Sequence, residues 1–216
     1  SPDHGDKQSK RGKKRSFWSE YRTLLSSPIL WIVGMSYACV GFTVLVPFTF
    51  LNVYAIEEMG LTFKTATSFF TLLAVSGIIG KLVLGVLSDR LGRLAVMALC
   101  GLCLGFGCLG LIHGEGLIAT FFSVALIGVG FGAVWPVYAA AAVDLFPRGQ
   151  AGSVIGLWTV FLGVGSILSP VLCGWSIDFS GSHVPAFYLG FGGGLLAAAL
   201  LLPLPGLKLS KTRTHR

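Results

Sequence analysis

The chain has 216 residues, of which 54% are hydrophobic and 12% are charged, and its formal net charge is +7 at pH 7. Soluble domains carry about 25% charged residues, so this composition and a mean hydropathy of +0.80 exclude an ordinary water-soluble domain. All but one of the charged residues lie between apolar segments or in the two terminal segments. This is the charge distribution of a membrane protein.

Six apolar segments are long enough to cross a bilayer as helices, because a hydrocarbon core of about 30 Å requires about 20 helical residues. In chain order they are residues 28–53, 66–87, 94–112, 117–143, 153–173 and 185–206. Each is continuously apolar, whereas the strands of a membrane β-barrel are short and alternate apolar with polar residues. We therefore predict an all-α membrane protein with six transmembrane helices. The expected domains are a cytoplasmic basic linker (1–27), a six-helix transmembrane domain (28–206) and a cytoplasmic basic tail (207–216).

The positions of Lys and Arg predict the orientation, since positively charged loops stay on the cytoplasmic side. All basic residues except Lys64 and Lys81 lie in the two terminal segments or in the gaps after the second and fourth apolar segments. We therefore expect a multi-pass protein of the cell membrane with both termini in the cytoplasm. This asymmetry explains the net charge without a nucleic-acid partner. The basic residues 10–15 form either a solvated linker or a contact with anionic membrane lipid.

The residues that membrane enzymes and metal sites use are missing from the predicted spans. The four histidines lie in loops or tails, and no Gly-x-Ser-x-Gly, His-Glu-x-x-His or paired aspartates occur within a span. Cys100 and Cys103 have a zinc-like spacing, but no second pair accompanies them. We therefore expect buried thiols, no enzymatic activity, no metal and no cofactor.

Glycine is abundant, with 30 residues of 216, about twice the usual ~7%. Small faces, at which helices can approach closely, are expected at Gly101 and Gly105, at Gly152 and Gly156, and at Gly128, Gly130 and Gly132. Pro136 and Pro170 lie close to further glycines in the fourth and fifth segments. Two interpretations stay open for these segments, tight packing alone and helices that bend during transport.

The gap after the second segment contains the most specific motif of the chain, residues 85–93 with the sequence Gly-Val-Leu-Ser-Asp-Arg-Leu-Gly-Arg. It resembles the signature Gly-x-x-x-Asp-Arg-x-Gly-Arg of the major facilitator superfamily, and it matches at Gly85, Asp89, Arg90, Gly92 and Arg93. We expect Gly85 to permit close helix contact and Gly92 to permit a sharp turn. Asp89 can pair with Arg90, with Arg93 or with a neighbouring helix terminus.

The resemblance implies a fold and a mechanism. The chain looks like the second six-helix half of a twelve-helix major facilitator fold, and residues 144–152 are similar to the family's segment between its tenth and eleventh helices. The implied partner is a missing N-terminal six-helix half. The family resemblance also implies alternating access, with Asp89 and the neighbouring arginines acting as a cytoplasmic latch that favours the outward-facing state.

Lys81 is the one charged residue inside a predicted span, about 12 Å along the helix from Asp89. Its ammonium group either attracts an anionic substrate or extends to the membrane interface as a structural group. Residues 80–85 look like the segment that carries Arg or Lys in carboxylate-transporting branches of the superfamily, including oxalate–formate-type and monocarboxylate-type porters. Lys81, Trp135, Tyr138 and Asn52 are the substrate-binding residues that we predict.

The predicted function is that of a secondary transporter for a small organic solute, most narrowly an organic anion such as a monocarboxylate or dicarboxylate. Three alternatives stay open: a carrier of a neutral sugar, drug or amino acid, a receptor or scaffold that keeps the fold without transport, and a six-helix channel. No acidic residue lies within a predicted span. A proton-coupled mechanism would therefore require a carboxylate in the other half. Anion exchange or uniport would not require such a carboxylate.

Overall fold

The computed structural model describes residue 22 and residues 24–204. This part contains six long helices and one 3₁₀ turn, in the order α2 (Pro28–Glu57), α3 (Phe63–Leu91), α4 (Arg93–His113), α5 (Gly116–Leu145), η1 (Arg148–Gln150), α6 (Ala151–Ser180) and α7 (Val184–Leu201). All six helices are long and apolar enough to cross a membrane, which confirms the prediction of six apolar helices. The predicted linker lies almost entirely, and the predicted tail entirely, outside the described residues.

Local sequence sets the helix ends. Pro28 occupies the first turn of α2, as expected, because its missing N–H has no acceptor there. The helix α6 extends to Ser180, beyond the predicted end at 173, and stops where Gly181 adopts a left-handed conformation with φ of 72°. The helix α7 ends at Leu201 instead of 206, because Pro203 follows two residues later and cannot continue a helix.

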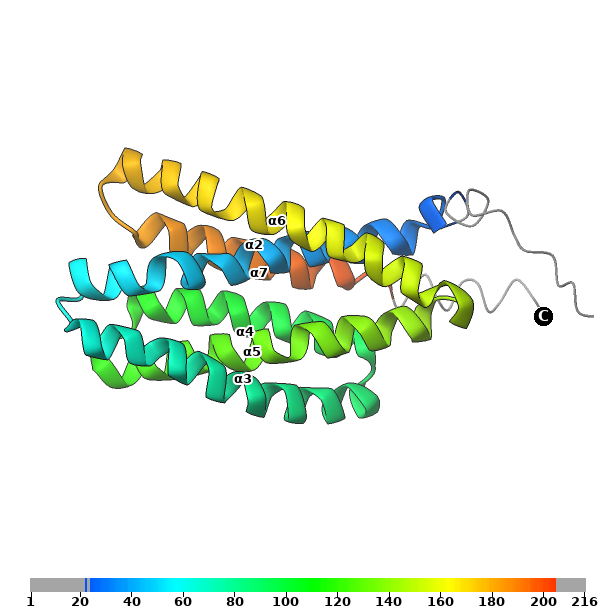
Figure 1. Cartoon of the computed structure of the whole chain (residues 1–216), viewed down its shortest axis with the longest axis horizontal. Coiled ribbons are helices and arrows are strands. Elements are labelled where there is room, and N and C mark those ends of the chain that lie inside the picture. The colour runs from blue at the N-terminus through cyan, green and yellow to red at the C-terminus, as the bar shows by residue number, and fades with distance from the viewer. Residues whose placement is uncertain (1–21, 23, 205–216) are drawn as a thin grey trace, which may run out of the picture.

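The six helices run side by side along the long axis of the molecule (Figure 1). Across the view, α6 forms one edge, α2 and α7 follow, then α4 and α5, and α3 forms the opposite edge. The most extensive helix contacts join α3 with α5, α2 with α6, α4 with α5 and α4 with α7. The bundle has two ends, which we name by residues: the Arg93 end, where α3 turns into α4, and the Glu58 end, where α2 leads into α3. The predicted orientation places the Arg93 end in the cytoplasm.

Glycine allows the closest helix contacts. A Cβ atom on Gly132 of α5 would lie 1.9 Å from the carbonyl oxygen of Gly77 of α3, so neither helix could stay in place beside a side chain there. In the same way, Gly101 and Gly105 of α4 pack against the backbone of Gly194 of α7. The small faces predicted at 101–105 and 128–132 are therefore confirmed.

The small face predicted at Gly152 and Gly156 is wrong for the described part of the chain. A Cβ atom at either position would meet no atom within 4 Å, because this side of α6 points away from the other described helices. Both α5 and α6 continue as helices through Pro136 and Pro170, and bending of these helices stays a prediction.

The outermost helices expose the most apolar surface. Only 28% of the apolar window of α3 and 22% of that of α6 is buried, compared with 56% for α2. Large side chains on these open faces include Ile78 and Leu82 of α3 and Ile167 and Val171 of α6. In water such faces would be unstable, so they require lipid or another protein surface as cover.

Candidate functional site

The predicted signature motif forms a polar cluster at the Arg93 end. Gly92 has φ of 93°, which glycine tolerates, and this sharp turn makes Arg93 the first residue of α4. The Arg93 Nη1 atom lies 2.6 Å from Asp89 Oδ1, and its Nε atom donates to Asp144 Oδ2 at 3.0 Å. Arg93 also donates to the Ser88 hydroxyl. One guanidinium group therefore joins the end of α3, the start of α4 and the end of α5.

Two details of this Arg93 cluster differ from the sequence-based expectations. Gly85 makes no close helix contact in the described part of the chain, because a Cβ atom there would meet nothing within 4 Å. Asp144 was not predicted as a partner of Arg93. It lies 51 residues away in sequence, and only its position in a loop on the same predicted side of the membrane hinted at the contact. The latch role of Gly85, Asp89, Arg90, Gly92 and Arg93 stays a prediction.

An aromatic pocket lies between α2, α5 and α6. Its aromatic lining consists of Tyr37, Trp135, Tyr138 and Trp158. Tyr37 stacks on Tyr138 with ring centroids 4.0 Å apart and an interplanar angle of 16°. Trp135 meets the edge of Tyr37 at 6.3 Å, and Trp158 meets Tyr138 edge-on at the same distance. The predicted site residues Trp135 and Tyr138 therefore share one pocket, to which Tyr37 and Trp158 also contribute.

Two of these aromatic residues use their polar hydrogens within the protein. The single hydroxyl hydrogen of Ser36 is donated to the carbonyl oxygen of Ala197 at 2.9 Å, so the contact of 3.1 Å between Ser36 and Tyr138 has Tyr138 as its donor. The Nε1 atom of Trp158 donates to the carbonyl oxygen of Leu30 at 3.0 Å. Both side chains are almost fully buried. The phenol of Tyr138 is therefore a structural donor, although its ring lines the pocket.

Lys81 lies on α3, outside this pocket. It is ten residues from the end of α3 at Leu91, about 15 Å along the helix. Gly80, beside Lys81, packs directly against the backbone of Val129, six residues before Trp135 on α5, so Lys81 lies nearer the Glu58 end than Trp135 and Tyr138 do. Lys81 is exposed and forms no ion pair within the described part of the chain.

The fourth predicted residue, Asn52, lies elsewhere. It is fifteen residues after Tyr37 on α2, about 22 Å along the helix and close to the Glu58 end. Its Oδ1 atom is enclosed by protein and has no hydrogen-bond donor in the described structure. The structure therefore brings Trp135 and Tyr138 together, and neither Lys81 nor Asn52 lines the aromatic pocket.

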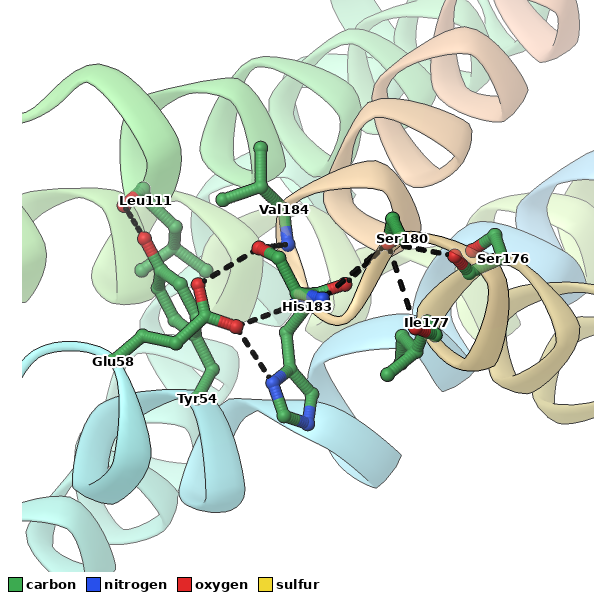
Figure 2. A network of polar contacts seen from close by, with 9 residues as sticks. Tyr54, Glu58, Leu111, Ser176, Ile177, Ser180, His183 and Val184 are labelled. Carbon is green, nitrogen blue, oxygen red and sulfur yellow. Dashed lines mark hydrogen bonds and ion pairs between the residues drawn. The ribbon is translucent and has the colours of Figure 1, made fainter.

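A second polar cluster, which the sequence did not predict, lies at the Glu58 end (Figure 2). The Glu58 carboxylate follows the last residue of α2 and accepts hydrogen bonds from three donors at the start of α7. These are the Ser182 hydroxyl at 3.0 Å, the His183 Nδ1 atom at 2.7 Å and the backbone N–H of His183. Because His183 is the N-cap of α7, Glu58 supplies a negative charge to the N-terminus of that helix.

The environment of Glu58 shifts its acidity. Burial raises the pKa of the carboxyl, but the hydrogen bonds from the backbone and side chain of His183 and from Ser182 favour the charged form, and the net effect is a pKa below the ordinary value of 4.5. The sequence offered one signal for this Glu58 cluster, since Glu58 and His183 both fall in short gaps on the same predicted side of the membrane.

Comparisons with a family model and with known proteins agree on one family. The model of the Major Facilitator Superfamily matches residues 1–124 and 69–215 of this chain. The probable galactarate/D-glucarate transporter GudP of Bacillus subtilis (strain 168) is 28% identical over 207 residues, which cover 91% of this chain and 44% of that protein. The monocarboxylate transporter 12-B of Danio rerio is 29% identical over 205 residues, covering 88% of this chain and 40% of that protein.

A solved structure shows the same fold. That of the E. coli fucose:proton symporter FucP matches with a TM-score of 0.75 at 18% identity, covering 92% of this chain and 47% of the symporter. The chain spans less than half the length of the curated relatives described above. The described fold is therefore that of a six-helix half of such a transporter.

Proposed function

Because the chain belongs to the Major Facilitator Superfamily, we propose that it is the second six-helix half of a secondary transporter that moves a small organic anion by alternating access. The substrate that we propose is a monocarboxylate or dicarboxylate. Similar proteins carry galactarate, D-glucarate or monocarboxylate in their names, which supports this class. The transport cycle contains no chemical step and requires no cofactor or metal.

The position of Lys81 is the observation that carries the anion proposal. In the described helices, every other charged residue lies within three residues of a helix end. A charge about 15 Å inside a transmembrane helix is costly and marks a site of function. An anion that binds beside Lys81 neutralises this charge, and the loaded site can then change its accessibility without moving an isolated charge through the membrane.

The remaining parts of the proposal concern the other half and the latch. The open apolar faces of α3 and α6 provide surface for the second six-helix unit and for lipid. The Arg93 cluster would hold three helix ends together in one state and separate when that end opens. We place that end in the cytoplasm of a cell-membrane transporter, on the basis of the Lys and Arg distribution.

Uptake into proteoliposomes tests the proposal. The full-length protein is reconstituted, and the uptake of labelled galactarate, D-glucarate and lactate is compared with that of neutral sugars, for the wild type, Lys81→Gln and Lys64→Gln. Lys64 is the matched control, because it is also an exposed lysine of α3 but lies in the first turn. We expect saturable carboxylate uptake that Lys81→Gln abolishes and Lys64→Gln preserves. Uptake of neutral solutes alone, or normal carboxylate uptake by Lys81→Gln, would refute the anion proposal.

A further inference from the structure

The polar hydrogens of the aromatic pocket divide into two kinds. Those of Tyr138 and Trp158 are donated to protein acceptors. Those of Tyr37 and Trp135 are not, because neither side chain makes a hydrogen bond in the described part of the chain. A donor that the protein leaves unpaired at the wall of a pocket is available to a ligand.

Tyr37 is the more informative of the two. Its side chain is 2% exposed, so the ring is held by protein on almost all sides. Its hydroxyl oxygen is not among the polar atoms that the protein encloses without a partner. The exposed surface of Tyr37 therefore includes its hydroxyl group. Tyr37 also lines the aromatic pocket. Trp135, in contrast, is 49% exposed, and solvent or lipid headgroups could satisfy its N–H.

The ring of Tyr37 is fixed within the bundle. Tyr37 lies nine residues from the start of α2 at Pro28, about 14 Å along the helix from the Arg93 end. The stack on Tyr138 fixes the Tyr37 ring, so its hydroxyl is presented at a fixed place and loses little entropy when it binds a ligand.

We propose that Tyr37 is a specificity-determining residue that donates a hydrogen bond from its hydroxyl to an oxygen of the bound solute, with Trp135 as a second donor. The inference rests on the proposed transport function and names the chemistry that its site prefers. The unpaired groups that line the pocket bring two N–H or O–H donors. Both groups can donate to an acceptor such as a carboxylate oxygen, and the open volume of about 10 Å³ in the pocket admits one such atom and not a whole solute.

Two tyrosines in one stack provide a matched pair of variants. Tyr37→Phe removes a hydroxyl without a protein partner, and Tyr138→Phe removes a hydroxyl that donates to Ser36. We expect Tyr37→Phe to raise the KM for the transported carboxylate at least tenfold, as the loss of a hydrogen bond to a charged acceptor predicts, and to leave the thermal unfolding temperature unchanged. Tyr138→Phe should lower the unfolding temperature, because it removes the hydrogen bond to Ser36.

Uptake kinetics in proteoliposomes and thermal unfolding in detergent measure these two quantities for both variants and for Lys81→Gln. An unchanged KM in Tyr37→Phe, or a fall in its unfolding temperature as large as that of Tyr138→Phe, would overturn the inference. If Tyr37→Phe is silent while Lys81→Gln abolishes carboxylate uptake, the inference fails and the anion proposal stands. If Tyr37→Phe raises the KM of a neutral solute and Lys81→Gln is silent, the anion proposal fails and the donor role of Tyr37 stands.

Discussion

The Glu58 cluster predicts a measurable loss of stability on replacing one carboxylate by an amide. In Glu58→Gln the side chain keeps its shape but loses its charge, and the amide oxygen can replace only part of the acceptor capacity that serves Ser182 and His183. The start of α7 also loses the negative charge beside its N-terminus. Both effects weaken the connection between the ends of α2 and α7.

The exposure of the cluster sets the magnitude. Buried hydrogen bonds to charged groups contribute about 1.5–3 kcal/mol each, whereas solvent-exposed ion pairs contribute about 0.2–1 kcal/mol. The side chains of Glu58 and His183 are 27% and 12% exposed, between these limits. Because the Gln oxygen retains part of the bonding, we expect a net loss of about 1–2 kcal/mol. For a chain of this length that corresponds to a fall of about 2–8 °C in unfolding temperature.

The lowered pKa of Glu58 predicts how the stability changes with pH. The pKa of Glu58 is lower in the folded protein than its ordinary value of 4.5, so the unfolded chain binds the proton more readily. The stabilisation is therefore complete above pH 4.5 and is lost as the pH falls through the lower folded pKa. Glu58→Gln should accordingly be less stable than the wild type at pH 7 and should approach it in strong acid.

Thermal unfolding in detergent at pH 7 and at successively lower pH is the assay, with Glu57→Gln as the control. Glu57 is the adjacent acidic residue and is exposed, and it makes no hydrogen bond or ion pair in the described part of the chain. An unfolding temperature in Glu58→Gln that equals that of Glu57→Gln at pH 7 would refute the reasoning, as would an unchanged difference from the wild type across the acid range.

Four further substitutions test the Arg93 cluster and the glycine contacts. Asp89→Asn should reduce transport with little loss of folding, and normal uptake by a folded variant would contradict the latch. Arg93→Gln should lower the unfolding temperature more than Asp89→Asn, because it leaves both of its carboxylate partners unpaired; equal temperatures would count against this. Gly132→Ala should cost at least about 1–3 kcal/mol of stability, because its Cβ would meet Gly77. Gly152→Ala, at an open position, should be neutral in the same thermal assay.

The sequence was sufficient to predict the six helices, because the bilayer sets the length and apolar character that a spanning helix needs, independently of tertiary packing. It was also sufficient for the sharp turn at Gly92, which the motif placed correctly. It failed at Gly85 and Gly152 for one shared reason. A small residue permits close contact, but whether a neighbour uses the space depends on how each helix is rotated in the bundle, and no local pattern fixes that rotation.

The candidate site was predictable only in part for the same reason. Trp135 and Tyr138 were predicted because they lie deep in the fourth apolar segment beside Pro136, and their spacing of three residues places them on one helix face. Tyr37 was missed because its stack on Tyr138 joins residues of two helices far apart in sequence. Asn52 was grouped with them on polarity alone, although helical rise already separates it from Tyr37 by about 22 Å.

The two polar clusters take corresponding positions when the first three long helices are compared with the last three. If α2, α3 and α4 are matched in order with α5, α6 and α7, as in the inverted repeats of this family, the α3–α4 turn corresponds to the α6–α7 turn, and the end of α2 corresponds to the end of α5. Arg93 at the first turn binds Asp144 at the end of α5, and His183 at the second turn binds Glu58 after the end of α2.

The two sets of three helices therefore tie to each other twice, once at each end of the bundle, with Arg93 or His183 on the turn and the carboxylate at the helix end. The two ties differ in chemistry. Arg93 holds two carboxylates, Asp89 and Asp144, through a guanidinium that stays charged at any pH the protein meets, whereas the single carboxylate of Glu58 accepts from a serine hydroxyl, a backbone N–H and the His183 ring. Protonation of Glu58 removes the stabilisation that accompanies its lowered pKa, so acid on the Glu58 side weakens the contact at that end of the bundle.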